Sequence, residues 1–187
     1  MRMTTPRIAP VELEDASAEQ RELLAPFAET LGVLNIFRTM AHTPKALKRF
    51  NVWGGYVMGH GTSLSPRQRE IAILRTGLLC RAGYEWVQHR RIGEEAGLSA
   101  AEIEAIKIGA DAGTWSDGET AILRAADELV TDFCVADATW TALGGLGEQQ
   151  RMDVVYTVGQ YVLVSMLLNS FGVQLDPGQT LDSDFPR

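Results

Sequence analysis

The sequence of 187 residues contains only two cysteines, Cys80 and Cys134, and no C-x-x-C motif. Two cysteines are too few for the disulfide framework of a small secreted protein, so we expect reduced thiols and a cytoplasmic location. Both lie among apolar residues, where a free cysteine usually serves as a small core residue. The cysteine content therefore excludes a disulfide-stabilised scaffold.

An excess of basic residues is also lacking. The chain has 17 Lys and Arg against 24 Asp and Glu, which gives a formal net charge of −7 and a pI near 5.0. A negative surface repels nucleic acid phosphates and anionic lipid headgroups. The longest mostly apolar run, residues 161–168, is far shorter than the ~20 residues that cross a bilayer. The N-terminal residues MRMTTPRIAP lack the apolar segment of a secretory signal. We therefore expect no nucleic acid and no membrane among the partners.

Strand signals are nearly absent, whereas helix start and stop signals alternate along the chain. Capping boxes open at four serines, each followed three residues later by Gln or Glu. Thr43-Pro44 is an N-cap residue followed by proline at the first helical position. The sequence predicts one all-α domain over residues 1–187, with an N-terminal arm at 1–14 and an extended tail at 172–187. We expect the tail to cover a surface of the domain or of a partner subunit. The predicted helices begin near Ser17, Asn35, Thr43, Ser65, Tyr84, Ser99, Ser116, Asp137 and Glu148.

The segment from Leu64 to Gly97 contains the strongest candidates for chemistry. Glu85 and His89 are four residues apart and share a helix face, and Glu70 lies on the preceding helix beside apolar residues. A carboxylate on an apolar face is costly unless it is paired or functional. Such a set can hold and relay one proton, so we predict Glu70, Glu85 and His89 as acid–base residues. The same spacing also occurs in solvated surface pairs, and Arg67 or Arg75 is an alternative partner for Glu70.

A binding site for a small carboxylate near two glutamates needs a cation, and Arg75 or Arg81 is the candidate. Tyr84 and Trp86 flank Glu85 and are candidate pocket walls as well as packing residues. His60, in a glycine-rich turn, is a further candidate. No third ligand stands at a recognisable distance from Glu85 and His89, so we expect no metal site and no cofactor.

Several motifs resemble the carboxymuconolactone decarboxylase family, which also contains the alkylhydroperoxidase D proteins. The likeness spans most of the chain from Asn35 to Val173. The resemblance implies an all-α, alkylhydroperoxidase D-like helical bundle that assembles into dimers, trimers or hexamers. The apolar helix around residues 152–168 agrees with this, because one thin bundle would leave part of it exposed. The motifs are Leu64-Ser-Pro-Arg-Gln-Arg-Glu70, Ile73-Leu74-Arg75, Tyr84-Glu85-Trp86 with His89, and Ala96-Gly97-Leu98-Ser99.

The peroxidase branch of that family carries a C-x-x-C four residues before a histidine. Aligned through His89, its cysteines fall on Ala82 and Glu85 of this chain, and Cys80 lies two residues too early. The resemblance therefore favours a cofactor-independent lyase that decarboxylates a small carboxylated lactone or related oxygenated acid. In it His89 is the proton donor or base, Glu70 orients it, and Glu85 holds the substrate or completes the relay. The alternatives are a peroxide-handling protein that uses Cys80 alone and a non-catalytic small-molecule binder.

Overall fold

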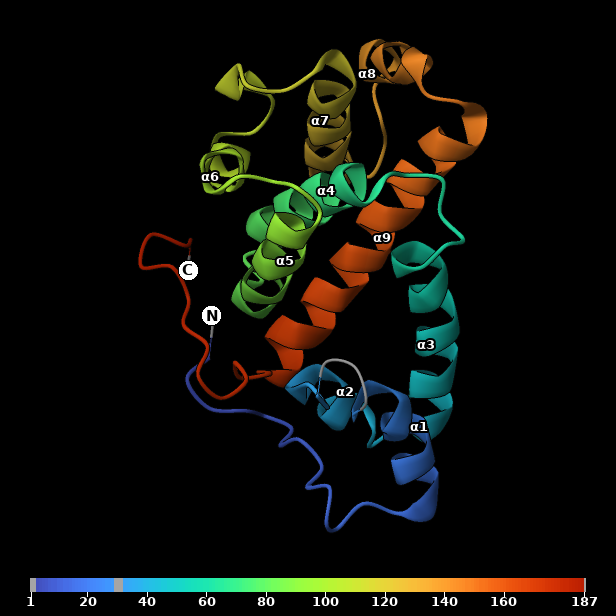
Figure 1. Ribbon diagram of the computed structural model, residues 1–187, viewed down its shortest axis with the longest axis vertical. Helices are drawn as coiled ribbons and strands as arrows, with labels where there is room; N and C mark the ends of the chain where they lie inside the picture. Colours follow the sequence, from blue (N-terminus) through green and yellow to red (C-terminus); the bar gives the residue numbers. More distant parts are fainter. Residues whose placement is uncertain (1–2, 29–31, 187) are drawn as a thin grey trace.

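The computed structural model describes residues 3–28 and 32–186, and these form helices and loops with no strand. The all-α prediction is confirmed. Figure 1 shows α4, α5 and α9 in the middle of the molecule, α7 and α8 at one end, and α1 and α2 at the other. The helices are α1 (Ala18–Ala28), α2 (Asn35–Met40), α3 (Pro44–Met58), α4 (Pro66–Leu79), α5 (Gly83–Glu95), α6 (Ala100–Ile108), α7 (Asp117–Thr131), α8 (Asp137–Ala142) and α9 (Glu148–Phe171), with 3-10 turns at Ala110–Ala112 and Leu143–Gly145.

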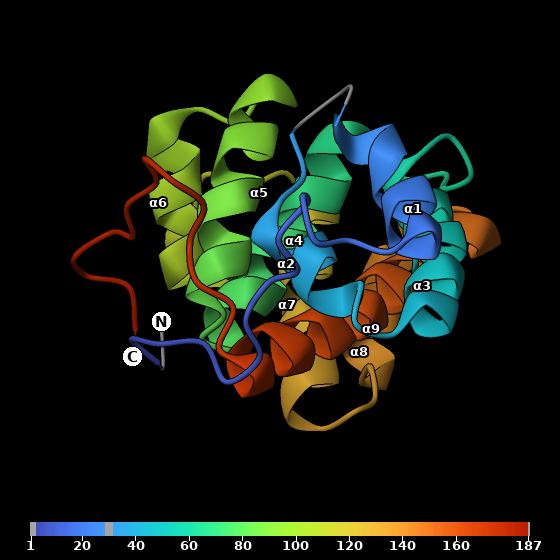
Figure 2. The same ribbon diagram turned by 90° about the horizontal axis from the view of Figure 1, so that it is seen from below.

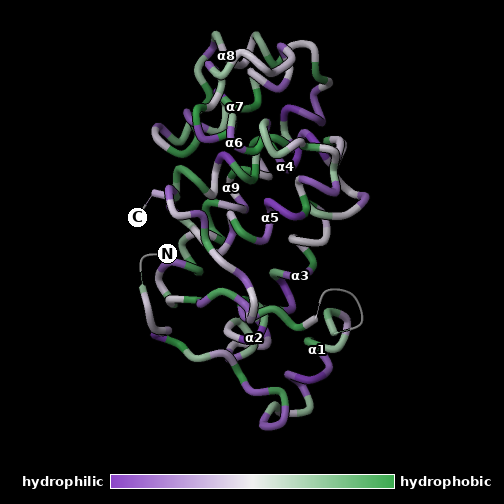
Figure 3. The backbone as a smooth tube through the Cα atoms, turned by 60° about the vertical axis from the view of Figure 1, so that its left-hand side comes forward, coloured by the Kyte–Doolittle hydropathy of each residue, from purple (hydrophilic) through white to green (hydrophobic). Residues whose placement is uncertain are grey.

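The predicted capping boxes form. Ser65, Ser99 and Ser116 each accept a hydrogen bond from the backbone N–H three residues later, and the Gln or Glu at that position reaches back to the cap. The same reciprocal pair joins Ser17 and Gln20 at the start of α1. Thr43 is the N-cap residue of α3, as predicted, but its hydroxyl donates to the Met40 carbonyl at 3.2 Å and makes no cap bond. In Figure 3, short hydrophobic and hydrophilic stretches alternate along the helices, as in amphipathic helices.

Helix α4 is the centre of the packing. It contacts α5, α7 and α9 most extensively, and all its residues from Arg69 to Leu78 are buried. A helix covered on every side must bury its polar residues as well, and each buried charge then needs a partner. Glu70 and Arg75 are two such charges.

Both ends of the described chain pack on the helices of the same subunit. In the N-terminal arm, the backbone N–H of Arg7 donates to the carbonyl of Phe171, at the end of α9. The C-terminal tail runs beside α5 and α6 (Figure 2), where Asp182 accepts from the indole of Trp86 at 3.0 Å and Phe185 packs on the Trp86 ring. The tail therefore covers a surface of its own domain, which is one of the two surfaces that the sequence predicted.

Helix α9 is long and apolar. Among the described residues it is the one helix that length and composition would allow to cross a membrane, and 44% of that apolar window is buried inside the structure. Residues 161–168, the longest mostly apolar run of the sequence, are only part of this helix, because a few polar residues interrupt the apolar pattern before them. Core helices of globular proteins can have the same length and composition, so these two properties show only that α9 is unusually apolar.

Candidate active site

The α4–α5 hairpin brings Glu70 and His89 into direct contact. Glu70 is completely buried, and its Oε2 lies 2.6 Å from Nδ1 of His89. Arg69 donates from Nε to Glu70 Oε1 at 3.1 Å and from Nη1 to the Met58 carbonyl at 3.1 Å. A carboxylate that accepts from a guanidinium is ionised, so the imidazole donates from Nδ1. This fixes the ring and leaves Nε2 for a bound molecule.

Glu85 is buried, yet it has far fewer partners. Ser165 of α9 donates to its Oε2 at 3.3 Å, whereas Oε1 makes no hydrogen bond with any described residue. The backbone of Gly77 lies beside this carboxyl group, since a Cβ at position 77 would stand 2.8 Å from Oε1. A buried polar atom without a partner is rare and indicates a site for water or a ligand.

The surroundings of Glu85 favour its neutral form. Burial raises the pKa of this carboxyl well above its ordinary value, and the nearby charge of Glu70 raises it further, while the hydrogen bond from Ser165 acts in the opposite direction. The two carboxyl groups of this region therefore have different environments. The guanidinium of Arg69 favours the anionic form of Glu70, whereas burial favours the neutral form of Glu85, which is the form that can donate a proton.

The substitution Glu85→Gln should make folding stability less dependent on pH. The pKa of Glu85 is higher in the folded chain, so its favourable contribution is present below the ordinary carboxyl pKa and is lost as the pH rises through the folded value. We expect wild-type stability to fall with a slope approaching ~1.4 kcal/mol per pH unit in that window relative to the glutamine variant. Urea unfolding at a series of pH values measures this, with exposed Glu95→Gln as control. Parallel wild-type and Glu85→Gln profiles would contradict it.

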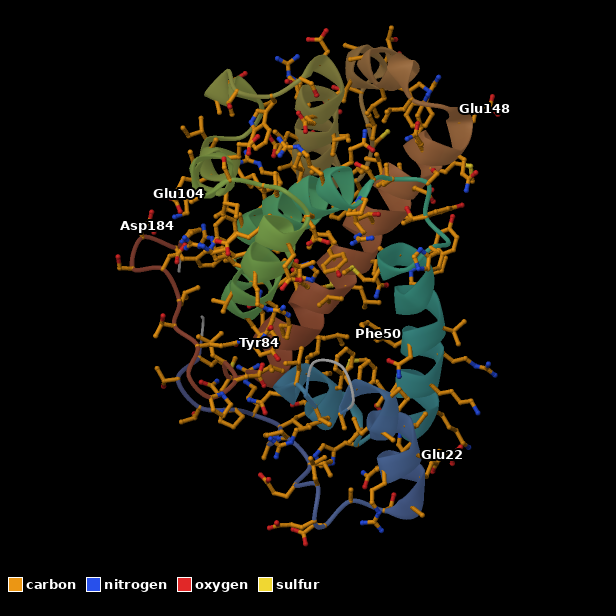
Figure 4. All side chains as sticks on the ribbon, viewed as in Figure 1. Glu22, Phe50, Tyr84, Glu104, Glu148 and Asp184 are labelled. Atoms are coloured by element: carbon orange, nitrogen blue, oxygen red, sulfur yellow. The ribbon has the colours of Figure 1, made fainter. Side chains whose placement is uncertain are left out.

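A cavity of about 310 Å³ opens between α3, α5 and α9. Phe50, on the side of α3 that faces α9, and Tyr84, at the lower end of α5, are two of its walls (Figure 4). Besides Glu85, it contains a second buried polar atom that has no partner among the described residues, Oδ1 of Asn51. Its polar lining residues are Asn51, Glu85, Gln88, His89, Arg91 and Gln160, and most of the others are apolar or aromatic.

Tyr161 of α9 is a further lining residue beside the imidazole. Its ring meets that of His89 edge-on, with 4.8 Å between centroids, and its hydroxyl donates to the thioether of Met58 at 2.9 Å. Burial raises the pKa of Tyr161 well above its ordinary value, and the charge of Glu70 adds to this. A thioether is a weak acceptor, so the neutral phenol can turn its proton toward a ligand oxygen.

The predicted site residues divide into those at the cavity and those away from it. Glu85, His89 and Tyr84 line the cavity, and Glu70 supports His89 from behind. Tyr84 also donates to Asp176 of the tail at 2.6 Å.

The remaining predicted substrate-binding residues lie outside the cavity lining. Arg75 pairs with Asp127 at 2.5 Å and donates to the carbonyl of Ile106, so its guanidinium is a structural link. Trp86 is buried against the tail, and Arg81 and His60 are exposed. The geometry thus does not support the roles predicted for these four residues.

Arg91 lines the cavity, although the sequence suggested only a solvated basic pair with Arg90. It lies at the exposed rim and pairs with Glu95 at 2.6 Å. Arg90 is held elsewhere, by Asp182 at 2.7 Å. The sequence distinguishes the two arginines only weakly, because the one difference is that Arg91 lies beside the helix face that carries Gln88, His89 and Ile92.

Neither cysteine lines the cavity, and they do not form a disulfide. Cys80 is half-buried at the end of α4. Cys134 is exposed, so the prediction that it is a core residue is wrong: it lies in the loop between α7 and α8, beside an exposed Phe133 with positive φ. Within residues 3–28 and 32–186, no three His, Cys, Asp or Glu side chains gather as a metal ion would require.

Comparison with known proteins agrees with this geometry. Residues 44–128, which include the α4–α5 hairpin, match the carboxymuconolactone decarboxylase family. No curated protein matched the chain.

Similar folds occur among solved structures. An uncharacterized peroxidase-related protein from Ralstonia eutropha JMP134, with an alkylhydroperoxidase AhpD core, has a TM-score of 0.82 at 19% identity and covers 94% of each chain. A peroxidase-related protein from Silicibacter sp. TM1040 has a TM-score of 0.80 at 17% identity, over 95% of this chain and 98% of its own. The debrominase Bmp8 in complex with 2,3,4-tribromopyrrole has a TM-score of 0.76 at 14% identity, over 93% and 94%. At these identities the structures establish a shared fold. The match over residues 44–128 and the shared fold together support the resemblance to the carboxymuconolactone decarboxylase family.

Proposed function

We propose that this protein is an acid–base enzyme that decarboxylates a small carboxylated lactone or a related oxygenated acid. The observation that carries the proposal is the pairing of two proton-handling groups in one apolar cavity. His89 is oriented by the buried Glu70 carboxylate, and Glu85 is a buried neutral acid with a free oxygen atom. Proton transfer between positioned groups and a substrate typically contributes 10²–10⁴-fold to a rate.

The division of roles follows from the reaction. Loss of CO₂ breaks a C–C bond and leaves its electron pair on the substrate as an enolate, which must then take up a proton. Glu85 supplies that proton, since it is uncharged in the resting site. The Tyr161 hydroxyl donates a hydrogen bond to the developing oxyanion, and Nε2 of His89 does the same when the imidazole carries a second proton. Glu70 holds the imidazole in place and does not touch the substrate.

Arg91 binds the substrate carboxylate in this scheme. Among the described residues that line the cavity it is the one arginine or lysine, and its half-exposed guanidinium pairs with Glu95 on the surface. A carboxylate entering the rim can exchange with Glu95 at little cost, because exposed ion pairs are worth only ~0–1 kcal/mol. The apolar walls then favour a flat ring inside the cavity. The related debrominase, solved with a brominated pyrrole, agrees with a small ring as ligand.

A screen for CO₂ release from carboxylated lactones and β-keto acids tests the proposal. On any acid that is turned over, Arg91→Gln should raise KM by roughly 10- to 100-fold with little change in kcat, since a charge-assisted hydrogen bond contributes about 1.5–3 kcal/mol. Arg90→Gln, next in sequence but outside the cavity lining, is the matched control and should leave KM unchanged. Release of no CO₂ from any acid that binds would contradict the lyase assignment.

Peroxide reduction is the second candidate, because two of the similar structures belong to peroxidase-related proteins. In this chain it would depend on Cys80, which lies at the end of α4 and outside the cavity lining. Consumption of an alkyl hydroperoxide that disappears in Cys80→Ser and persists in His89→Ala would favour this reading. If the protein binds a ligand but turns nothing over in either assay, the remaining interpretation is a non-catalytic small-molecule binder.

A further inference from the structure

Among the described residues, three primary amides line the cavity, and the subunit itself uses only one of them. Gln88 on α5 donates from Nε2 to Asp176 at 2.8 Å and to Gln179 at 2.9 Å, both in the tail. Asn51 on α3 and Gln160 on α9 make no side-chain hydrogen bond with any residue that the structure describes. Two amides of the cavity are therefore available to a bound molecule.

Burial makes these two amides unfavourable for the fold. Gln160 is only 5% exposed, and the Oδ1 atom of Asn51 is shielded from solvent. A buried polar group without a partner destabilises a protein, and an apolar side chain of the same size would avoid that cost. Residues that lower stability without a contact inside the subunit are typical of functional sites.

The wall around Asn51 also leaves room for a ligand. Gly54 and Gly55 follow it at three and four residues, so all three lie on one face of α3, and all three line the cavity. Beyond its own helix backbone, a Cβ at Gly55 would meet no atom of the described residues within 4 Å, and one at Gly54 would meet only the Phe50 ring, at 4.0 Å. Glycine is unfavourable inside a helix, and packing within the subunit does not require it here. The missing side chains enlarge the cavity next to the Asn51 amide.

The chemistry of the two amides defines the group that they can bind. An amide has an acceptor oxygen and an NH₂ donor and carries no charge. The Asn51 oxygen needs a donor, whereas Gln160 can turn either end of its amide toward a ligand. A hydroxyl meets both requirements, because it donates one hydrogen bond and accepts another. A carbonyl or ether oxygen would leave the Asn51 oxygen unpaired, and a charged group would lose its hydration without gaining a counter-charge from the amides.

The position of Gln160 on α9 separates it from the acid of the site. Gln160 stands five residues before Ser165, which donates to Glu85. Five residues advance a helix by about 7.5 Å along its axis. A single ring with substituents on opposite sides can span such a distance, so one substrate can reach both groups.

From these observations we propose that Asn51 and Gln160 form a subsite for an uncharged hydroxyl group of the substrate, which donates to Oδ1 of Asn51 and accepts from the Gln160 amide. The substrate class is thereby narrowed from a small ring acid to a hydroxylated ring acid. The inference rests on the proposed function for one contact, that of the substrate carboxylate with Arg91.

Calorimetric binding of matched ring acids at pH 7 tests the subsite without any turnover. The probes are benzoate, 3- and 4-hydroxybenzoate, the fluorobenzoates of the same pattern, which cannot donate, and 4-formylbenzoate, which can only accept. At least one hydroxybenzoate should bind roughly 10- to 100-fold more tightly than benzoate and than its fluoro analogue, the gain expected from two neutral hydrogen bonds. Equal affinities, a preference for the formyl compound, or no binding of any probe would overturn the proposal.

Apolar substitutions of similar size identify the groups that read the hydroxyl. Asn51→Leu and Gln160→Met should each remove most of the preference for the hydroxybenzoate and leave the affinity for benzoate nearly unchanged. Gln149→Met, at an exposed position of α9 outside the cavity lining, is the matched control and should keep the preference. If both cavity variants keep the wild-type preference, the hydroxyl binds elsewhere and the proposal is wrong.

Thermal melts of the ligand-free variants separate a binding role from a structural one. Asn51→Leu and Gln160→Met should leave Tm unchanged or raise it by up to about 4 °C, because each removes an unpaired buried polar group. Gln88→Met should lower Tm, since it breaks two hydrogen bonds with the tail. A lower Tm for both Asn51→Leu and Gln160→Met would show that these amides serve the fold, and would overturn the subsite.

The results also distinguish the subsite from the lyase assignment. If the protein prefers a hydroxybenzoate and loses the preference in the variants, but releases CO₂ from no acid, the subsite is supported and the proposed chemistry is wrong. If the protein decarboxylates ring acids equally well with and without a hydroxyl, the chemistry is supported and the subsite is wrong.

Discussion

Replacing His89 with alanine should lower turnover of any acid that the protein decarboxylates by about 10²–10⁴-fold, the range typical for loss of a positioned acid–base group. The effect should fall on kcat more than on KM, because the imidazole interacts most strongly with the charge that develops in the transition state. The Nε2 atom is the only part of the ring left for the substrate, since Nδ1 is held at 2.6 Å by Glu70.

His89→Gln separates this effect from a folding defect. Glutamine can still donate a hydrogen bond to Glu70, so the variant should fold with nearly wild-type stability and yet lose activity as His89→Ala does. His60→Ala is the histidine control, since His60 is exposed and outside the cavity lining. Steady-state kinetics and a thermal melt of each variant are sufficient. If His89→Gln keeps more than a tenth of the wild-type kcat, His89 does not act on the substrate.

Replacing Glu70 with glutamine should destabilise the fold by about 3–5 kcal/mol, the cost of removing one partner from a buried ion pair. Glu70 is fully buried and contacts both Arg69 and His89, so its loss leaves a buried guanidinium without its counter-charge. The volume of the side chain is nearly unchanged, so packing does not contribute.

Urea unfolding measures this, and an exposed ion pair provides the comparison. Glu95→Gln removes the partner of Arg91 on the surface and should cost less than ~1 kcal/mol. If Glu70→Gln lowers the free energy of unfolding by less than ~1 kcal/mol, the prediction is wrong. Water or another group would then stabilise the charge of Arg69 in place of Glu70.

The sequence predicted the helices well because their boundaries depend on local interactions. Each capping box needs only residues three apart, and Ser17, Ser65, Ser99 and Ser116 form theirs. The meeting of Glu70 and His89 was also predictable, since two consecutive helices joined by a tight turn pack side by side. In contrast, the burial of α4 on every side depends on α7 and α9, which lie far away in the sequence.

Which arginine lines the cavity could not be predicted from the sequence of its own helix. Arg75 resembles a pocket residue in the sequence, but Asp127 on α7 engages it. Arg91 resembles a surface residue, but residues of α3 lie opposite α5 across the cavity and make its rim part of the lining. Trp86 is covered by the tail through Asp182, a contact between residues 96 positions apart. Helical periodicity gives the direction of a side chain and not what lies in that direction.

The contact between Gly77 and Glu85 bears on how such a site evolves. A Cβ at position 77 would stand 2.8 Å from the carboxyl oxygen of Glu85, so a glutamate at 85 fits where position 77 is glycine. A cysteine, which the resemblance places at 85 in the peroxidase branch, is shorter and relaxes that requirement. Positions 77 and 85 are therefore expected to co-vary among homologous sequences, with larger residues at 77 accompanying smaller ones at 85. An attempt to engineer thiol chemistry into this chain should accordingly change 77 together with 82 and 85, filling the space that the carboxyl group leaves.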